Sequence, residues 1–208
     1  MADMKAALTS PTRYMPAWSP IPEPGSRHPV LGITGPSGSG KSTLAKRLAL
    51  DFGARVVCLD DYFCHKAERP VVNRYPSFER PHQYDGARMA RDVAAQRLCC
   101  PVIAEGFLLF TYPDLLEACN VRIFVDISED EILTRRKLRR DAGYGKPKRV
   151  ERGFDAHGLE EWRSFGAIQA EVDGVIALDG TLSPDLLFEA TREKADFHGA
   201  VPTSPLIF

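Results

Sequence analysis

The chain has 208 residues, of which 44% are hydrophobic and 26% are charged, the balance of a single globular domain. Its 27 Lys and Arg residues nearly equal its 28 Asp and Glu residues, and a net charge of -1 argues against a general nucleic-acid-binding protein. No apolar run is long enough to cross a bilayer, and the five cysteines show no C-x-x-C spacing. We therefore expect a cytoplasmic protein without a membrane anchor, disulfide framework or zinc site.

The first 29 residues differ from the rest because they hold six of the sixteen prolines. Proline fixes φ and lacks an amide donor, so this stretch is predicted to be a flexible arm. We expect the folded domain to cover residues 30–197, with a lid at about 139–156. Residues 198–208 are then a C-terminal tail.

From residue 30 onward, short apolar runs alternate with amphipathic stretches. Strands are predicted at residues 30–34, 54–59, 101–107, 121–127 and 174–178. Helices are predicted at residues 42–51, 86–98, 128–140 and 157–172 and from 183 onward, and residues 60–85 are predicted to be a long polar loop. Within the second helix, the apolar contacts are expected from Ala87, Met89, Ala90, Val93 and Ala94. The alternation implies an α/β domain with a parallel sheet, helices on both faces, and a ligand at the carboxyl ends of the strands.

A glycine-rich motif lies between the first predicted strand and the first predicted helix. Residues 35–43 read Gly-Pro-Ser-Gly-Ser-Gly-Lys-Ser-Thr and match G-x-x-x-x-G-K-[ST]. In such a loop, backbone N–H groups and the helix N-terminus bind phosphates, the lysine reaches the β and γ phosphates, and the hydroxyl after it ligates Mg²⁺. The motif predicts a nucleoside triphosphate site formed by Gly35, Ser37, Gly38, Ser39, Gly40, Lys41, Ser42 and Thr43.

Carboxylates follow the second and third predicted strands. Asp60 and Asp61 come directly after the second strand, where Asp60 can accept the proton of a substrate hydroxyl or hold Mg²⁺ through water. The alternative is an Asp pair that opens a solvated loop. Glu105 ends the third strand, where a buried carboxylate is costly without a role, so we expect it to orient Mg²⁺ or to form a structural ion pair.

Two further groups of residues point to a substrate and a lid. Tyr84 and Asp85 suit an aromatic ring and a ribose, although Asp85 also suits a helix cap. Four arginines follow the Ser128 capping box and precede a span with glycines; they are Arg135, Arg136, Arg139 and Arg140. Arginines on a closing lid stabilise a transferring phosphoryl group, and the alternative is a solvated basic face near a helix C-terminus. Cys64, His65 and His157 form no ligand or nucleophile cluster and are predicted to be structural or surface residues.

Taken together, these residues resemble the uridine kinase group of P-loop kinases and, within it, the nicotinamide riboside kinases. The resemblance covers roughly residues 30–195. It rests on the glycine-rich loop and on the pieces Asp60-Asp61-Tyr62-Phe63, Gln83-Tyr84-Asp85, Glu105-Gly106-Phe107-Leu108-Leu109-Phe110, Arg135-Arg136-x-x-Arg139, Gly153-Phe154-Asp155 and Leu178-Asp179-Gly180-Thr181. An Asn-aromatic-Asp-His-Pro motif associated with uridine kinases is absent after the long loop, which favours nicotinamide riboside over uridine.

The resemblance implies a P-loop fold with a five-stranded parallel sheet and a mobile lid. It implies that ATP and Mg²⁺ are used to phosphorylate the 5′-hydroxyl of a ribonucleoside, most simply nicotinamide riboside. Uridine, cytidine, another small alcohol such as pantothenate, or a non-catalytic nucleotide switch remain alternatives. Of the site residues, Lys41 and Asp60 are expected to act in catalysis with Arg135, Arg136 and Arg139. Arg135 and Arg139 are also expected to bind ATP, and Ser42, Asp60 and Glu105 to hold the metal. The nucleoside is expected at Asp60, Asp61, Tyr62, Phe63, Tyr84, Asp85 and Arg136, and the adenine at Thr181, Leu182, Ser183 and Pro184. A monomer or a homodimer is expected.

Overall fold

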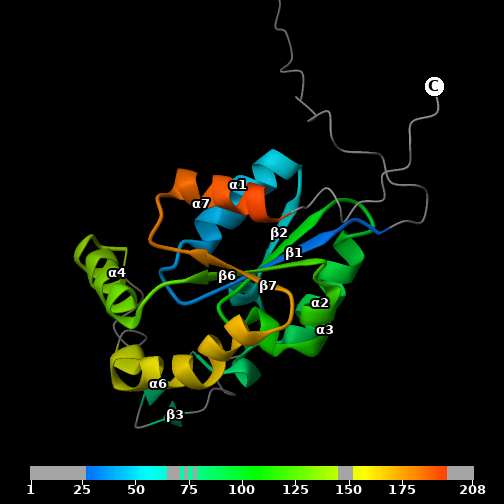
Figure 1. Ribbon diagram of the computed structural model, residues 1–208. Helices are drawn as coiled ribbons and strands as arrows, with labels where there is room; N and C mark the ends of the chain where they lie inside the picture. The colour runs from blue at the N-terminus through cyan, green and yellow to red at the C-terminus, as the bar shows by residue number, and fades with distance from the viewer. Residues whose placement is uncertain (1–26, 65–70, 73–74, 77–78, 145–151, 196–208) are drawn as a thin grey trace, which may run out of the picture.

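The computed structural model describes residues 27–64, 71–72, 75–76, 79–144 and 152–195 (Figure 1). Most of the predicted N-terminal arm, the whole predicted tail and the middle of the predicted lid lie outside these residues. Within the described part of the chain, no helix has the length and apolar character needed to span a membrane.

Five parallel strands form the central sheet in the order β2-β5-β1-β6-β7. They are β1 (Val30–Thr34), β2 (Arg55–Cys58), β5 (Val102–Glu105), β6 (Val121–Asp126) and β7 (Val175–Asp179). All five strands predicted from apolar runs are confirmed. β1 pairs with β5 on one side and β6 on the other, and all five of its residues are buried. The strand order reverses beside β1, so the loop after β1 lies where ligands bind in open α/β sheets. A separate antiparallel pair is formed by β3 (Val71–Val72) and β4 (Tyr75–Pro76).

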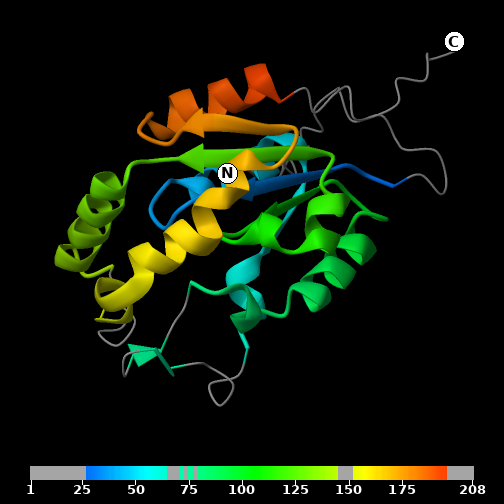
Figure 2. The ribbon, with the colours of Figure 1, turned by 60° about the horizontal axis from the view of Figure 1, so that its bottom comes forward.

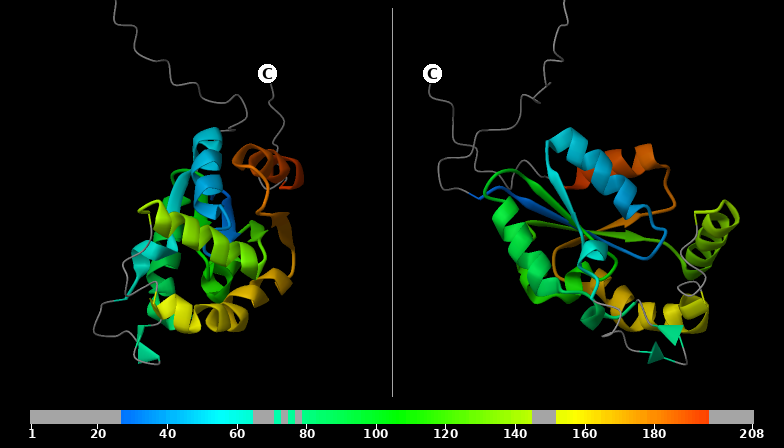
Figure 3. Two further views of the ribbon diagram at one scale, coloured as in Figure 1. Left: turned by 90° about the vertical axis from the view of Figure 1, so that its left-hand side faces the viewer. Right: turned by 180° about the vertical axis from the view of Figure 1, so that it is seen from behind.

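Helices cover both faces of the sheet, as predicted (Figures 1 and 3). The first face carries α1 (Lys41–Phe52) and α7 (Pro184–Lys194), and the second carries α2 (Gly86–Gln96) and α3 (Pro113–Ala118). α4 (Glu129–Asp141) stands beyond the carboxyl end of β6. Its cap is the predicted one, because Ser128 Oγ accepts a hydrogen bond from the Glu131 amide at 3.2 Å. Ser183 caps α7 in the same way.

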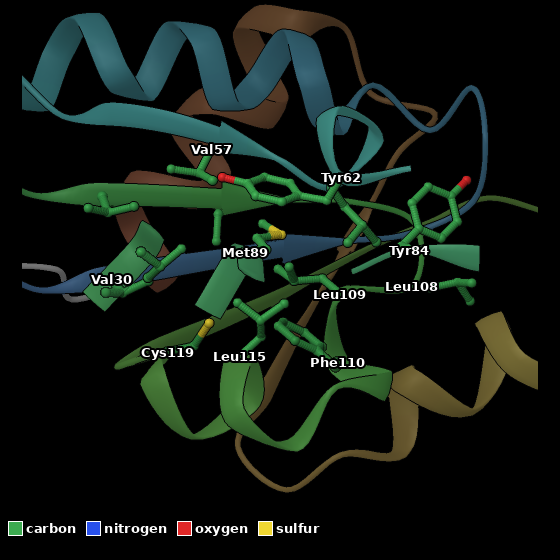
Figure 4. Packing of buried hydrophobic residues seen from close by; sticks show 14 of the residues in the cluster. Val30, Val57, Tyr62, Tyr84, Met89, Leu108, Leu109, Phe110, Leu115 and Cys119 are labelled. Atoms are coloured by element: carbon green, nitrogen blue, oxygen red, sulfur yellow. The ribbon is translucent and has the colours of Figure 1, made fainter. Parts of the chain in front are cut away.

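Two hydrophobic clusters fill the space between the sheet and its helices. On the first face, Leu44 and Leu48 of α1 and Leu187 of α7 pack on the apolar residues of β1 and β6. On the second face, Met89 of α2 and Leu115 of α3 pack under the sheet, together with residues of the segment that follows β5 (Figure 4). Burial of these side chains on both faces stabilises the sheet, at about 1.5 to 3 kcal/mol for each large apolar side chain.

The structure differs from the sequence expectations in three places. The residues after β2 form a short 3₁₀ helix, η1 (Leu59–Tyr62), and another, η3 (Pro81–Gln83), precedes α2, so the predicted loop is partly ordered. Ala87 and Ala94 of α2 are exposed, because the buried stripe of that helix passes through Met89 and Val93. η4 (Leu109–Thr111) and α3 were not predicted, because they are too short to show a period.

The helical segment predicted at residues 157–172 is longer than predicted and is wound irregularly; we call residues 154–171 the segment after the predicted lid. It runs through η5 (Phe154–Gly158), α6 (Leu159–Glu161), η6 (Trp162–Gly166) and η7 (Ala167–Glu171). The segment lies along the lower side of the molecule in Figure 1 and crosses in front of the sheet in Figure 2. η5 and η6 are π-helical turns. Such turns are rare and occur frequently at functional sites. Phe154 and Trp162 pack with Phe124 and Ile127 in a third apolar cluster, which fixes the segment against the end of β6.

Gln169 of η7 cross-links this segment to the sheet. Its Oε1 accepts hydrogen bonds from Thr34 Oγ1 and from the Phe110 amide, both at 2.8 Å. Its Nε2 donates to the Phe107 carbonyl at 2.8 Å and to the Gly166 carbonyl at 3.0 Å. The side chain is 1% exposed, so these bonds are made out of contact with water.

Replacing Gln169 by leucine is expected to lower the free energy of unfolding by about 3 kcal/mol, because the Thr34 hydroxyl and the Phe110 amide lose their buried partner. Urea unfolding monitored by circular dichroism measures the change. Gln96→Leu is the matched control, since Gln96 Oε1 is buried without a hydrogen-bond partner among the described residues. Equal stability of Gln169→Leu and Gln96→Leu would contradict the cross-link.

Candidate active site

The glycine-rich loop leaves the carboxyl end of β1 and enters α1. Gly35 has a φ of 142°, and a Cβ at this position would stand 2.3 Å from the Val125 carbonyl oxygen. Only glycine fits here, so the loop packs directly against β6. Gly38 and Gly40 also have positive φ, and the loop turns back to open α1 at Lys41. The geometry is that of a phosphate-binding loop at a helix N-terminus.

Lys41, Ser42 and Glu105 meet at the base of this loop. Lys41 Nζ donates to the Pro36 carbonyl at 3.2 Å, within the loop itself. Ser42 Oγ donates to Glu105 Oε2 at 3.2 Å, and Glu105 is 4% exposed at the end of β5. The strand order brings these residues together from positions 63 apart in sequence. This is the neighbourhood expected for the hydroxyl and carboxylate at a magnesium site.

Asp60 lies in η1, directly after β2, and its side chain is exposed toward the same edge of the sheet. Its charge acts on neighbours from several elements. Burial raises the pKa of the Cys58 thiol, and the Glu105 and Asp60 carboxylates raise it further. Burial likewise raises the pKa of Tyr84, and Asp60 adds to that shift. Asp60 and Glu105 therefore share one electrostatic environment at the carboxyl ends of β2 and β5.

Two of the predicted lid arginines contact the phosphate-binding loop. Arg135 Nη1 donates to the Gly38 carbonyl at 2.9 Å, and its Nε donates to Glu131 Oε1 at 2.5 Å. Arg136 Nη1 donates to Ser37 Oγ at 3.3 Å, and its guanidinium lies 3.6 Å from the centroid of the Phe154 ring. Arg136 is 9% exposed, so α4 directs it inward rather than into solvent.

Arg139 and Arg140 are exposed on the last turn of α4. Arg140 Nη1 lies 3.9 Å from Asp155 Oδ2, so that it bridges α4 and the segment after the predicted lid. Arg139 and Arg140 thus form a basic face near the helix C-terminus, whereas Arg135 and Arg136 contact the phosphate-binding loop.

The turn between β7 and α7 lies against the same loop. A Cβ at Gly180 would stand 2.9 Å from the Ser39 carbonyl oxygen, so this turn touches the phosphate-binding loop. Thr181 donates from its amide and its Oγ1 to Asp179 Oδ1, at 2.8 and 2.6 Å, and these bonds lower the pKa of Asp179. The residues expected at the adenine, Thr181 to Pro184, are thus placed beside the loop, with Ser183 and Pro184 opening α7.

The residues expected to bind the nucleoside fall into two groups. Tyr62 turns into the core, where its hydroxyl donates to Asp92 Oδ2 at 2.7 Å, so the structure does not bring it to the site (Figure 4). Asp85 Oδ1 accepts a hydrogen bond from the Arg88 amide at 2.8 Å and so caps α2. This is the helix-cap role that the sequence had offered as an alternative to ribose binding.

Tyr84 and Phe63 stay close to the site and to each other. Their ring centroids are 4.9 Å apart and edge to face, and Tyr84 meets Phe107 in the same way at 5.6 Å. Tyr84 is 7% exposed, so its ring is buried between the rings of Phe63 and Phe107. Asp61 is exposed beside Asp60.

Glu79 is a site residue that the sequence interpretation missed. Burial raises its pKa to about 7; the Arg136 and Lys41 charges oppose this rise, while Asp60 and Glu161 add to it. Glu79 therefore lies within electrostatic range of Lys41, Arg136 and Asp60. The order aromatic, acidic, basic, proline in residues 78–81 is a partial form of the Asn-aromatic-Asp-His-Pro motif, and this signal could have found Glu79. The motif therefore does not separate nicotinamide riboside from uridine.

The raised pKa of Glu79 predicts a pH-dependent cost to stability. An unfolded carboxyl ionises near 4.5 and the folded one near 7, so the folded state binds the proton more tightly between these values. The stability contributed by this group therefore falls as the pH rises from about 4.5 to 7, and the penalty is constant above 7.

Glu79→Gln is expected to remove this penalty. The difference in Tm between the variant and the parent should shift in favour of the variant by about 4 °C or more between pH 5 and pH 8. Thermal unfolding at the two pH values measures it. A difference that does not change with pH would show that Glu79 is not held in a charge-disfavouring environment.

The donor set at the loop fits a magnesium ion bound together with nucleotide phosphates. Ser42, Glu105 and Asp60 offer hydroxyl and carboxylate oxygens, the ligands that Mg²⁺ prefers, and Mg²⁺ usually takes few protein ligands. Among the described residues, no group of three or more His, Cys, Asp and Glu side chains is gathered as a metal cage.

Comparisons with known proteins agree with this geometry. No family model matches the chain. The chain is 27% identical over 139 residues to a uridine kinase of Chlamydia pneumoniae, covering 53% of this chain and 63% of the relative. It is 25% identical over 195 residues to uridine-cytidine kinase B of Dictyostelium discoideum, covering 74% of this chain and 80% of that protein. It is 28% identical over 185 residues to human nicotinamide riboside kinase 1, covering 76% of this chain and 87% of that protein.

In sequence, the chain is similar to members of the uridine kinase group of P-loop kinases. Its structure resembles that of a sugar kinase from Janibacter, with a TM-score of 0.57 at 19% identity over 85% of this chain and 99% of that one. At that identity the likeness concerns the fold alone, and it confirms the expected P-loop kinase fold. The match to the first of these relatives spans less than two thirds of that protein's length.

Proposed function

We propose that this P-loop kinase transfers the γ-phosphoryl group of ATP to the 5′-hydroxyl of a ribonucleoside. The observation that carries the proposal is the meeting of three groups at one edge of the sheet. Lys41 and Ser42 open α1, Asp60 follows β2, and Arg136 reaches in from α4. A phosphate-binding loop alone fits many nucleotide-binding proteins, whereas a carboxylate beside it at the acceptor side fits phosphoryl transfer to an alcohol.

The residues divide between donor and acceptor. Lys41 and the amides of the glycine-rich loop bind the β and γ phosphates, and Arg135 and Arg136 lie on the other side of that loop. Asp60 accepts the proton as the acceptor oxygen attacks phosphorus, the bond from phosphorus to the β–γ bridging oxygen breaks, and ADP leaves. Ser42, Asp60 and Glu105 would hold Mg²⁺, which when bound compensates the charge of the phosphates.

Nicotinamide riboside is the acceptor that we propose first, and uridine or cytidine second. The relatives named above phosphorylate, by their names, uridine, cytidine or nicotinamide riboside. On the acceptor side, the Asp60 and Glu161 carboxylates both raise the pKa of Glu79. An exposed carboxylate such as that of Asp60 favours a pyridinium cation over a neutral pyrimidine.

A panel of acceptors tests the proposal. The full chain is incubated with ATP, Mg²⁺ and nicotinamide riboside, uridine, cytidine, adenosine, pantothenate or gluconate, and ADP release is measured against a reaction without acceptor. Mass spectrometry then identifies the monophosphate. We expect nicotinamide riboside to give the highest kcat/KM, with phosphorylation at the 5′-oxygen.

The other outcomes are equally informative. Transfer to uridine or cytidine alone keeps the mechanism and removes nicotinamide riboside. Transfer to pantothenate or gluconate alone replaces the ribonucleoside by another alcohol. ATP binding without transfer to any acceptor would favour a nucleotide-dependent switch and overturn the proposed activity.

A further inference from the structure

Three ionisable side chains, of which two are buried, connect the loop of Glu79 to the helical segment of residues 154–171. Arg80 Nε forms an ion pair with Glu161 Oε1, and Glu161 Oε2 lies 3.1 Å from His157 Nδ1. The side chains of Glu161 and His157 are 5% and 4% exposed, and that of Arg80 is 31% exposed. Burying Glu161 and His157 costs free energy even when they are paired, so the pairing must offset this cost.

Arg80 connects the ion pair to two residues near the phosphate-binding loop, Glu79 and Tyr84. Arg80 follows Glu79 directly, and the turn η3 after it leads to Tyr84. The far side of this loop is already held, because the Tyr112 hydroxyl donates to the Pro81 carbonyl and Tyr84 forms a β-bridge with Phe63. The Arg80–Glu161 pair holds the near side, toward the helical segment.

The segment that carries Glu161 and His157 also contacts Arg136 of α4. Glu161 and His157 lie on α6 and η5, the same stretch that places Phe154 under the Arg136 guanidinium. Glu161 and His157 therefore lie in the segment that packs against Arg136, and Arg80 lies in the loop that carries Glu79. Glu161 is also one of the charges that raise the pKa of Glu79, so the two carboxylates are neighbours.

We propose that Arg80, Glu161 and His157 form a positioning network that fixes the acceptor loop, residues 79–85, against the segment after the predicted lid. The proposal rests on the proposed function for the identity of the acceptor. None of the three residues is required to touch the reacting atoms. They act through Glu79 and Tyr84, whose places relative to Arg136 and Asp60 depend on the Arg80–Glu161 pair. Binding of the acceptor then depends on the network, and binding of ATP does not.

The test compares Glu161→Gln, Arg80→Met and Arg80→Lys. Glu161→Gln keeps the shape of the side chain and removes its charge. We expect the KM for the acceptor to rise about tenfold in Glu161→Gln and Arg80→Met, with the KM for ATP within twofold of the parent. Arg80→Lys retains a cation, so its KM for the acceptor should lie close to that of the parent. The double variant Glu161→Gln with Arg80→Met should be no worse than either single variant, because both break one connection.

Glu129→Gln is the matched control. Glu129 forms an ion pair with Arg163 on the neighbouring turn of the same segment, and both side chains are well exposed, at 40% and 60%. This variant removes a carboxylate–guanidinium contact outside the network, and both KM values should stay within twofold of the parent. Tm is measured for every variant, and kinetics are measured well below the lowest Tm.

Two results would overturn the positioning role. The first is a lower Tm with both KM values unchanged, which is what a merely structural ion pair predicts. The second is a parallel rise in the KM values for acceptor and ATP, which would place the effect on the whole site. Should Glu161→Gln fail to fold, the comparison of Arg80→Met with Arg80→Lys decides between the same results, because Arg80 is only half-buried.

Hydrogen exchange separates this proposal from the proposed function. If the parent chain phosphorylates no acceptor, the function has failed, but the network still predicts faster exchange at the Gln83 and Tyr84 amides in Glu161→Gln. These amides donate to the Arg80 and Pro81 carbonyls at 3.2 and 3.1 Å. Exchange there should be at least about tenfold faster than in the parent and in Glu129→Gln. Unchanged exchange overturns the network independently of any activity.

Discussion

Replacing Lys41 by alanine is expected to lower kcat/KM for phosphoryl transfer by about 10² to 10³ while leaving the fold intact. Lys41 is the first residue of α1, and its Nζ rests on the Pro36 carbonyl at 3.2 Å, inside the loop that receives the phosphates. The ammonium group is thus held at the place where negative charge develops on the transferring group. A single-turnover assay with saturating acceptor, together with a thermal melt, measures the effect.

Lys46→Ala is the control for this variant. Lys46 is an exposed lysine of the same helix, so it reports any effect of losing one positive charge from α1. We expect its kcat/KM to stay within twofold of the parent. Near-normal turnover in Lys41→Ala would contradict the assignment of residues 35–43 as the phosphate-binding loop, whatever the acceptor is.

The elements that define the fold could be predicted because their signals are local. The apolar run of β1, the glycines after it and the amphipathic face of α1 lie within about 25 residues, and each has a direct physical cause. The carboxyl ends of parallel strands lie at one edge, so placing Asp60 and Glu105 after two strands also brought them to one site.

The acceptor side could not be predicted because its contacts are long-range. Arg80 and Glu161 are 81 positions apart, and neither belongs to a periodic pattern that would reveal its partner. His157 carries no signal of its own, and the sequence supported only a structural or surface role. The structure agrees that it is buried and paired, and adds the partner that gives it a role in the proposed network.

Tyr62 and Asp85 show how a motif can mislead about individual side chains. The pieces of sequence that contain them lie next to the site, yet Tyr62 bonds to Asp92 in the core and Asp85 caps α2. Both roles stabilise the backbone that presents Asp60 and Tyr84. The resemblance therefore selected segments that lie near the phosphate-binding loop, and only the packing showed that Tyr62 turns into the core and that Asp85 caps a helix.

Replacing Asp60 by asparagine is expected to lower kcat by about 10² to 10⁴, because asparagine keeps the size of the side chain and removes the proton acceptor. Asp60 lies in η1, directly after β2, and its carboxylate raises the pKa values of Cys58, Tyr84 and Glu79. If Asp60 also helps to hold Mg²⁺, the affinity for ATP should weaken when the metal is present and stay unchanged when it is absent.

Asp173→Asn separates this effect from a general loss of one carboxylate, since Asp173 is exposed in the turn before β7, away from the carboxyl edge of the sheet. Single-turnover phosphorylation of nicotinamide riboside and of uridine, with ATP binding measured in parallel, distinguishes the possibilities. A large loss of kcat with normal ATP binding assigns Asp60 to proton transfer alone. A loss of both, dependent on Mg²⁺, adds the metal role. Unchanged transfer in Asp60→Asn would show that the acceptor proton leaves by another route, and Glu79 would then be the carboxylate to test.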